Sequence, residues 1–271
     1  VNPGPGLTRR AAAVTELERT FPRPGAADTF KTLLRAMRLH QWSKNALIFV
    51  PLVLAHRWES SGLVVTNLLA FVAFGCAASA IYLVNDLIDL EADRLHHEKR
   101  HRPFAAGLLP LSWGIAMIPV LLATAFALAS TVNADFMWVL LGYLLLTITY
   151  SLFLKPIALL DVLALTSLYT LRIIAGAVAV SVPLSHWLLA FSMFIFFSLA
   201  LSKRFSELHN LKQKPEGKQT TRGYHTEDLP MVSLFGISSG YISVLIMVLY
   251  IHDLQADNLY DQPLWLWPVA I

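Results

Sequence analysis

"LVVTNLLAFVAFGCAASAIYLV", residues 63–84, is a run of 22 residues without a charged side chain. A helix of roughly 20 apolar residues is long enough to cross the roughly 30 Å hydrocarbon core of a bilayer. The rest of the chain has the same character, because 56% of its 271 residues are hydrophobic and only 14% are charged. This balance is too apolar for an ordinary soluble domain, so the sequence predicts a membrane protein built from helices.

Apolar stretches of this kind recur along the chain, and we expect an all-α, polytopic transmembrane helical bundle. They lie at about 46–55, 63–84, 111–131, 136–154, 157–180, 184–202 and 229–251. A final run, "PLWLWPVAI" at 263–271, reads as the beginning of another span, which makes about eight in the chain. The first stretch is short and contains Pro51, so it must take in preceding residues or lie kinked against its neighbours.

The distribution of positive charge predicts the orientation of the chain. Lys and Arg near span ends stay preferentially in the cytoplasm. They collect before the first stretch and after the second, fourth and sixth, whereas the alternate connections are poor in them. We therefore expect an integral protein of a bacterial-type inner membrane with a cytoplasmic amino terminus. Residues 1–29 read as a flexible cytoplasmic tail and 30–271 as the membrane domain, truncated at its carboxyl end.

The segment after the second stretch, "NDLIDLEAD" at 85–93, places three carboxylates at helical spacing. If the helix continues, Asp86, Asp89 and Asp93 lie within roughly 60° of one another on one face, with Asn85 beside them. Clustered carboxylates need a cation to neutralise them, and their oxygens suit Mg²⁺, which bridges to substrate phosphates. The basic side chains that follow would donate to the same phosphates; they are Arg94, Lys99, Arg100 and Arg102.

Two other interpretations of this segment stay open. It could be a solvated loop with internal salt bridges that merely follows the positive-inside rule. Against this, Asp86 and Asp89 lie close to the hydrocarbon, where an ionised group usually faces a polar cavity. His97 and His101 stand four residues apart and could form a zinc pair, but Pro103 and the surrounding cations disfavour a regular ligand-bearing helix.

At these residues the chain resembles the UbiA superfamily of intramembrane prenyltransferases, whose first aspartate-rich motif, N-D-x-x-D-x-x-x-D, is complete here. The continuation "DRLHHEKRHRPFAAG" is similar to the subgroup that contains decaprenyl-phosphate phosphoribosyltransferase. Further matching stretches are "RLHQWSKN" (38–45), "YSLFLK" (150–155), "LRIIAGAVA" (171–179) and "SKRFSEL" (202–208). The resemblance covers about residues 33–251 and implies the UbiA type of bundle, with a ninth span expected beyond the chain end.

Departures from the family pattern bear on the substrate. Leu39 stands where the family usually has Pro, and His97 replaces the Pro of an H-P pair. The second aspartate-rich motif of the aromatic prenyltransferases is not visible, since the nearest acids in the connection after 184–202 are Glu207, Glu227 and Asp228, among six Lys or Arg. This favours a site that must also hold an anionic acceptor.

The resemblance implies catalysis by Asp86, Asp89 and Asp93 with bound Mg²⁺, and further cations around an anionic lipid phosphate. The candidates for phosphate binding are Lys44, Tyr150, Lys155, Arg172, Lys203 and Arg204. Each has a plainer alternative. Arg172 could pair with Asp161 inside the bundle. Lys155 and Lys203 could be anchors that snorkel at span ends, and Tyr150 could belong to the interfacial aromatic belt.

The predicted function is transfer of a phosphoribosyl group from phosphoribosyl diphosphate to a polyprenyl phosphate. The alternative within the family is prenyl transfer from a polyprenyl diphosphate to an aromatic acceptor such as 4-hydroxybenzoate. An ion-coupled transporter is an alternative of another class, although transporters tend to carry their charges in mid-span. We expect a polyprenyl lipid, a diphosphate-bearing small molecule and the lipid bilayer as partners, and no nucleic acid.

Overall fold

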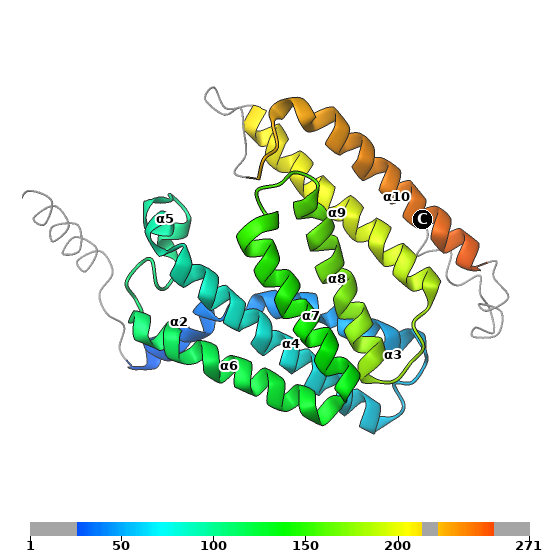
Figure 1. Cartoon of the computed structure of the whole chain (residues 1–271), viewed down its shortest axis with the longest axis horizontal. Coiled ribbons are helices and arrows are strands. Elements are labelled where there is room, and N and C mark those ends of the chain that lie inside the picture. The colour runs from blue at the N-terminus through cyan, green and yellow to red at the C-terminus, as the bar shows by residue number, and fades with distance from the viewer. Residues whose placement is uncertain (1–25, 213–221, 252–271) are drawn as a thin grey trace, which may run out of the picture. The chain divides into compact units, whose positions relative to one another are not determined.

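The computed structural model describes residues 26–212 and 222–251, and its elements are helices (Figure 1). The α-helices are α2 (Ala26–Ala36), α3 (Val50–Leu54), α4 (Ser61–Ile88), α5 (Leu90–Leu95), α6 (Leu111–Val132), α7 (Ala134–Thr149), α8 (Leu160–Ala179), α9 (His186–Lys212) and α10 (Leu229–Ile251). Shorter 3-10 and π segments join them. The all-α prediction is confirmed, while most of the predicted tail and the run 263–271 lie outside the described residues.

Six of the described helical segments are long and apolar enough to cross a membrane. They are Ser61–Ile88, Leu111–Val132, Ala134–Leu154, Leu160–Ala179, His186–Lys212 and Thr226–Ile251. Of the seven stretches expected within the described residues, 46–55 is not among them, and the eighth, 263–271, lies outside the described residues. The path of the stretch 46–55 begins as a 3-10 helix, Leu39–Phe49, and continues as α3, because Pro51 is suited to the start of a new helix and not to the interior of one.

The described chain divides into two compact units. The first unit contains the described residues up to Asn45 together with Val72–Leu128. The second unit contains Ala46–Phe71 and the described residues from Ala129 onward. Helix α4 therefore begins in the second unit and ends in the first.

In the first unit, small side chains on α4 allow the 3-10 segment to approach closely. The indole ring of Trp42 lies against Gly75, where an added Cβ would come within 2.6 Å of the ring. The indole N–H donates to Ser79 Oγ at 3.0 Å, and that hydroxyl donates to the Met37 carbonyl at 2.8 Å. Small residues at such contacts are typical of membrane helices, and the contact fixes the residues beside Arg38 against α4.

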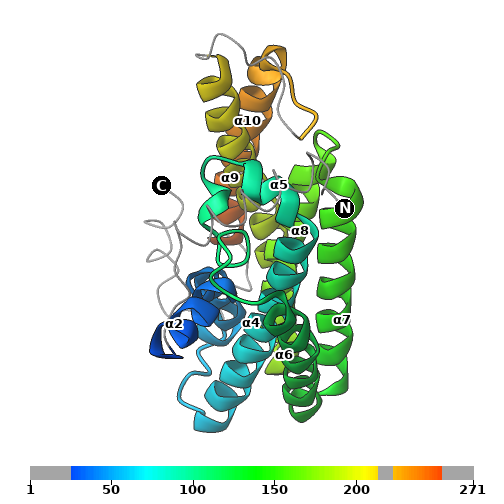
Figure 2. The same ribbon diagram turned by 90° about the vertical axis from the view of Figure 1, so that its left-hand side faces the viewer.

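In the second unit, α8 is the most enclosed helix. It packs between α7 and α9 and also contacts α3, while α9 and α10 run side by side in both ribbon views (Figures 1 and 2). Large apolar side chains of α7 and α10 stay exposed, which suits helices that face lipid. Most of the length of α8 is buried, so charged or polar groups on it need partners from the protein.

A backbone carbonyl of the 3-10 segment packs against the C-terminal end of α8. The Ile48 carbonyl lies directly against Gly176, where any Cβ would collide with it. The same oxygen accepts a hydrogen bond from Asn67 Nδ2 at 3.1 Å. Because a carbonyl outside the regular α-helical pattern must still be satisfied in an apolar environment, Gly176 and Asn67 together make the broken first stretch tolerable.

Candidate active site

The aspartate-rich segment lies at the end of α4 in the first unit, and the helical path continues through it. The Asp89 N–H donates to the Asn85 carbonyl at 2.9 Å, and the Asp93 N–H donates to the Asp89 carbonyl at 2.8 Å. Helix α5 therefore follows α4 with only a local irregularity at Asp89. This is the continuation that the spacing of the three aspartates assumed.

Two of the three carboxylates converge on one guanidinium group. Arg102 Nη1 lies 3.2 Å from Asp86 Oδ1 and 2.5 Å from Asp93 Oδ2. Both aspartate side chains are only 2% exposed, and Lys99 Nζ lies 3.9 Å from the other oxygen of Asp93. The loop after α5 therefore folds back, so that two of its cations, Lys99 and Arg102, contact the preceding aspartates.

Asp89 does not join this group. It is half-buried where α4 gives way to α5, and in the described part of the chain no three His, Cys, Asp or Glu side chains are placed to hold a metal ion. The zinc alternative for His97 and His101 accordingly gains no further ligand among the described residues. The protein brings together a pair of carboxylates, Asp86 and Asp93, and not the trio expected from the motif.

Arg38 belongs to the site although it is not among the residues predicted from the sequence. Its Nη2 donates to Asp86 Oδ1 at 2.6 Å, and its guanidinium lies 5.1 Å from the centre of the Tyr82 ring. Its backbone φ of 53° is in the left-handed region, which is uncommon for a residue other than glycine and concentrates at functional sites. The signal available in the sequence was its position at the start of the matching stretch 38–45.

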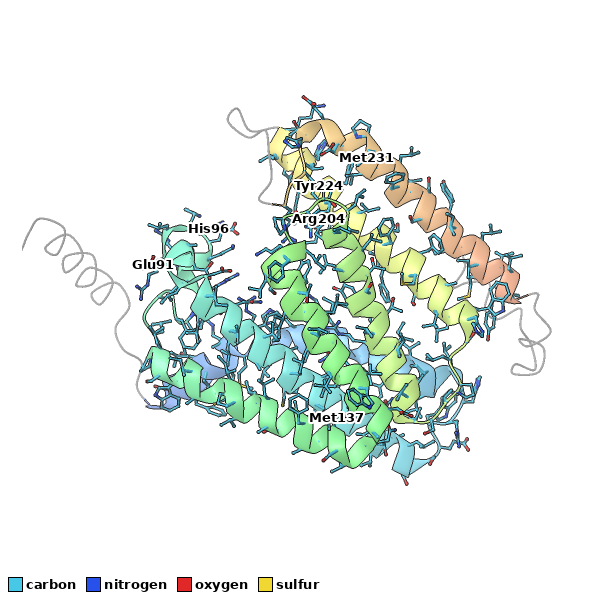
Figure 3. All side chains as sticks on the ribbon, in the orientation of Figure 1. Glu91, His96, Met137, Arg204, Tyr224 and Met231 are labelled. Carbon is cyan, nitrogen blue, oxygen red and sulfur yellow. The ribbon has the colours of Figure 1, made fainter. Side chains whose placement is uncertain are left out.

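The remaining predicted residues of the first unit are more exposed than this pair. Asn85 is half-buried at the end of α4, whereas the side chains of Lys44, Arg94 and Arg100 are exposed. Figure 3 shows Glu91 on α5 and His96 at the end of that helix, and both are exposed. Arg94 and Arg100, on α5 and in the loop after it, can therefore be reached by an anion from solvent.

The donor set at Asp86 and Asp93 fits a hard divalent cation. Two buried carboxylates share one positive group, and carboxylate oxygens are the ligands that Mg²⁺ accepts in proteins while it keeps waters or substrate phosphates in its other positions. A magnesium ion would be held by these two side chains. The Arg102 guanidinium lies between the two carboxylates, where a positive charge neutralises both of them.

The second unit carries a separate polar group, the Asp161 cluster, which comprises Asp161, Arg204, Glu207, Arg222 and Tyr224. Asp161 is fully buried in the first turn of α8 and accepts hydrogen bonds from Arg204 Nε and Tyr224 Oη, each at 2.7 Å. Arg204 also donates to Glu207 at 2.6 Å. Figure 3 shows Arg204 and Tyr224 beside each other near the end of α9.

Tyr224 fastens the segment before α10 to the loop before α8. Its hydroxyl accepts from the Leu159 N–H at 2.8 Å while it donates to Asp161. Burial and this hydrogen bond to Asp161 raise the pKa of Tyr224 above its ordinary value. Gly223 has a φ of 73° and lies against the Pro156 carbonyl, so this close approach requires glycine.

The "YSLFLK" stretch forms a π-helical turn, Tyr150–Leu154, at the end of α7. The Lys155 N–H donates to the Tyr150 carbonyl at 3.0 Å, and Lys155 itself is half-buried. Arg222 Nη1 donates to the Tyr150 hydroxyl at 3.1 Å, with 24% of the Arg222 side chain exposed. Irregular turns of this kind are frequent at functional sites. Tyr150, Lys155 and Arg222 therefore form the exposed margin of the Asp161 cluster.

The alternative that Arg172 pairs with Asp161 is wrong. The guanidinium of Arg172 donates to the Leu168 carbonyl at 2.5 Å and to the Tyr143 hydroxyl at 3.2 Å, and it lies over the Tyr143 and Tyr169 rings. Asp161 is instead paired with Arg204. The physical reason is distance, because eleven residues of helix separate Arg172 from Asp161 by about 16 Å along the axis.

The geometry does not support a phosphate-binding role for Arg204. Its side chain is 2% exposed, and its guanidinium is committed to the carboxylates of Asp161 and Glu207. Lys203, the neighbouring residue on α9, is exposed and stays available. The sequence alone could not show that Lys203 is exposed and Arg204 buried, because the two cations are adjacent.

Comparisons with known proteins agree with this architecture. Residues 46–269 match the model of the UbiA prenyltransferase family. The chain is 41% identical over 249 residues to y4nM of Sinorhizobium fredii, with 90% of this chain and 48% of that protein covered. It is 37% identical over 181 residues to decaprenyl-phosphate phosphoribosyltransferase of Mycobacterium tuberculosis H37Rv, with 65% of this chain and 60% of the enzyme covered.

Among solved structures, a UbiA homologue from Archaeoglobus fulgidus bound to GPP and Mg²⁺ has the same fold. The TM-score is 0.67 at 17% identity, and the match covers 88% of this chain and 84% of that one. The chain spans about half the length of y4nM and three fifths of the mycobacterial enzyme.

Proposed function

Because the chain belongs to the UbiA prenyltransferase family, a family of membrane transferases, we propose that it transfers a group between a diphosphate ester and a polyprenyl lipid. The donor we propose is phosphoribosyl diphosphate, and the acceptor is a polyprenyl phosphate. The observation that carries the proposal is the pair of buried carboxylates, Asp86 and Asp93, with the cations of the following loop directed back at them. The alternative of an ion-coupled transporter has no support from the family.

The choice of donor rests on the chain's own residues and on one relative. Similarity to decaprenyl-phosphate phosphoribosyltransferase favours a phosphoribosyl donor. The basic loop favours an anionic donor with several phosphate oxygens, because Arg binds such oxygens through its bidentate fork. In the second unit, Asp161 and Glu207 are committed to Arg204, which leaves neither of them for a second metal site.

In the proposed reaction, the bond between the anomeric carbon of the donor and the diphosphate oxygen breaks, and the diphosphate departs with the electron pair. A phosphate oxygen of the polyprenyl phosphate forms the new bond to that carbon. When bound, Mg²⁺ supplies Lewis-acid charge for the departing diphosphate. Arg94, Lys99, Arg100 and Arg102 bind the diphosphate oxygens, and Arg38 keeps the Asp86 side chain oriented through its hydrogen bond.

The second unit carries its own partly exposed polar side chains beside the Asp161 cluster. Lys155, Arg222 and Tyr150 are partly exposed at one end of α7 and α8, where they can donate to an anionic headgroup. Tyr224 and Asp161 hold Arg222 and its neighbours in place and do not themselves meet the substrate. Arg172 stays a structural residue in this proposal, since two tyrosine rings enclose it.

A product assay tests the proposal and its rival together. Purified protein with Mg²⁺ receives either labelled phosphoribosyl diphosphate with polyprenyl phosphate, or a prenyl diphosphate with 4-hydroxybenzoate. Labelled phosphoribosyl lipid from the first pair alone is the expected result. Product from the second pair alone would overturn the preferred donor and would favour prenyl transfer to an aromatic acceptor.

A further inference from the structure

The Arg102 guanidinium occupies the position that a divalent cation would need in order to bind the same carboxylate oxygens. A single nitrogen, Nη1, bonds Asp86 Oδ1 and Asp93 Oδ2, which come from different helices of the first unit. Two ionised carboxylates that are both 2% exposed need positive charge between them to remain ionised. A divalent cation bound by both side chains would need this same position. The guanidinium and the cation therefore exclude each other.

We infer that Arg102 is a tethered counter-ion that is exchanged for the metal. This inference rests on the proposed magnesium site at Asp86 and Asp93. Without a donor substrate, Arg102 neutralises the two carboxylates. When a cation arrives with a diphosphate, Arg102 leaves the carboxylates and binds the diphosphate oxygens, so that it keeps a strong anionic partner in both states.

The two arginines that contact Asp86 are built differently, which indicates which of them moves. Arg38 belongs to a tight, left-handed backbone position and lies over the Tyr82 ring. Arg102 follows a three-residue 3-10 turn, Lys99–His101, in the loop after α5, and its side chain is about as exposed as that of Arg38, 27% against 24%. Release of Arg102 breaks its bonds to Asp86 and Asp93, which the phosphate oxygens replace, whereas release of Arg38 would also lose the contact with the Tyr82 ring.

The exchange makes cation and diphosphate depend on each other. Alone, a divalent cation must displace Arg102 and leave its charge without a carboxylate, so binding is weak. With a diphosphate present, the displaced guanidinium gains the phosphate oxygens. By linkage, the cation then increases the affinity for the diphosphate by the same factor. Arg102 would thus prevent the carboxylates from binding a cation before the donor arrives.

The test is the affinity for Mn²⁺, an oxygen-binding substitute for Mg²⁺, measured by electron paramagnetic resonance on the purified full chain, with and without inorganic pyrophosphate. Without pyrophosphate, Arg102→Met should bind Mn²⁺ at least about tenfold more tightly than the wild type, because a competing charge is removed. With pyrophosphate, the wild type should gain affinity strongly and Arg102→Met much less. Arg102→Lys, which keeps one charge without the fork, should fall between them.

Arg35→Met is the matched control, because it removes one exposed charge from the same unit, and it should bind Mn²⁺ as the wild type does. The inference is overturned if Arg102→Met and Arg102→Lys bind Mn²⁺ alone no more tightly than the wild type. Asp86→Asn separates this failure from failure of the metal site itself. If Asp86→Asn leaves binding of Mn²⁺ with pyrophosphate intact, both the site and the exchange are refuted; if it abolishes that binding, the site stands on its own.

Discussion

Removal of the Asp161 carboxylate should destabilise the second unit strongly. Asp161→Ala leaves the Arg204 guanidinium buried, at 2% side-chain exposure, and also removes the acceptor of the Tyr224 hydroxyl. Breaking a buried ion pair costs about 3–5 kcal/mol. Glu207 stays as a second carboxylate for Arg204 at 2.6 Å, so we expect the low end, about 3 kcal/mol. In a protein of this size that corresponds to a fall in Tm of about 6–12 °C.

The assay is thermal unfolding of the purified protein followed by circular dichroism. Glu59→Ala removes an exposed carboxylate and should change stability by less than about 0.5 kcal/mol. The double variant Asp161→Leu with Arg204→Met removes both charges and should recover much of the loss, because apolar replacements of a buried pair are often neutral. A Tm for Asp161→Ala within about 1 °C of the wild type, or a double variant less stable than the single one, would refute the reasoning.

Three further predictions concern single residues. Asp86→Asn should lower turnover at least about a hundredfold in the product assay with unchanged helicity, and near-normal turnover would remove its metal role. Gly176→Ala should lose about 1–3 kcal/mol by thermal unfolding because its Cβ meets the Ile48 carbonyl, whereas Gly142→Ala, which has open space around it, should not lose stability. Because the pKa of Tyr224 is raised on folding, its contribution to stability is complete below pH 10 and is lost as the pH rises further, so Tyr224→Phe should show a smaller alkaline loss; equal losses would contradict this.

Much of the first unit's candidate site could be predicted from spacing alone. The carboxylates at 86 and 93 are seven residues apart, which is two helical turns, so their side chains share a face in any regular helix. The sequence also predicted that cations of the following basic run would lie near these carboxylates. The choice of Arg102 over Arg94 or Arg100 was not, because it depends on how the loop after α5 turns back.

Arg38 and the Asp161 cluster show why contact residues from distant segments escape such reasoning. Arg38 is separated from Asp86 by 48 positions, and Asp161 from Arg204 by 43. No periodicity links residues at these separations. Local reasoning suggests pairing the two charges of one span, Arg172 with Asp161, but Asp161 pairs with Arg204 of α9 instead.

The sequence by itself determined that the chain is a bundle of membrane helices, because length and hydropathy fix which segments can leave water, and it determined which segment carries the acids. Tertiary structure alone decided which charges face which. A buried carboxylate pairs with whatever cation packing brings within about 3 Å, and that proximity is a property of the folded bundle.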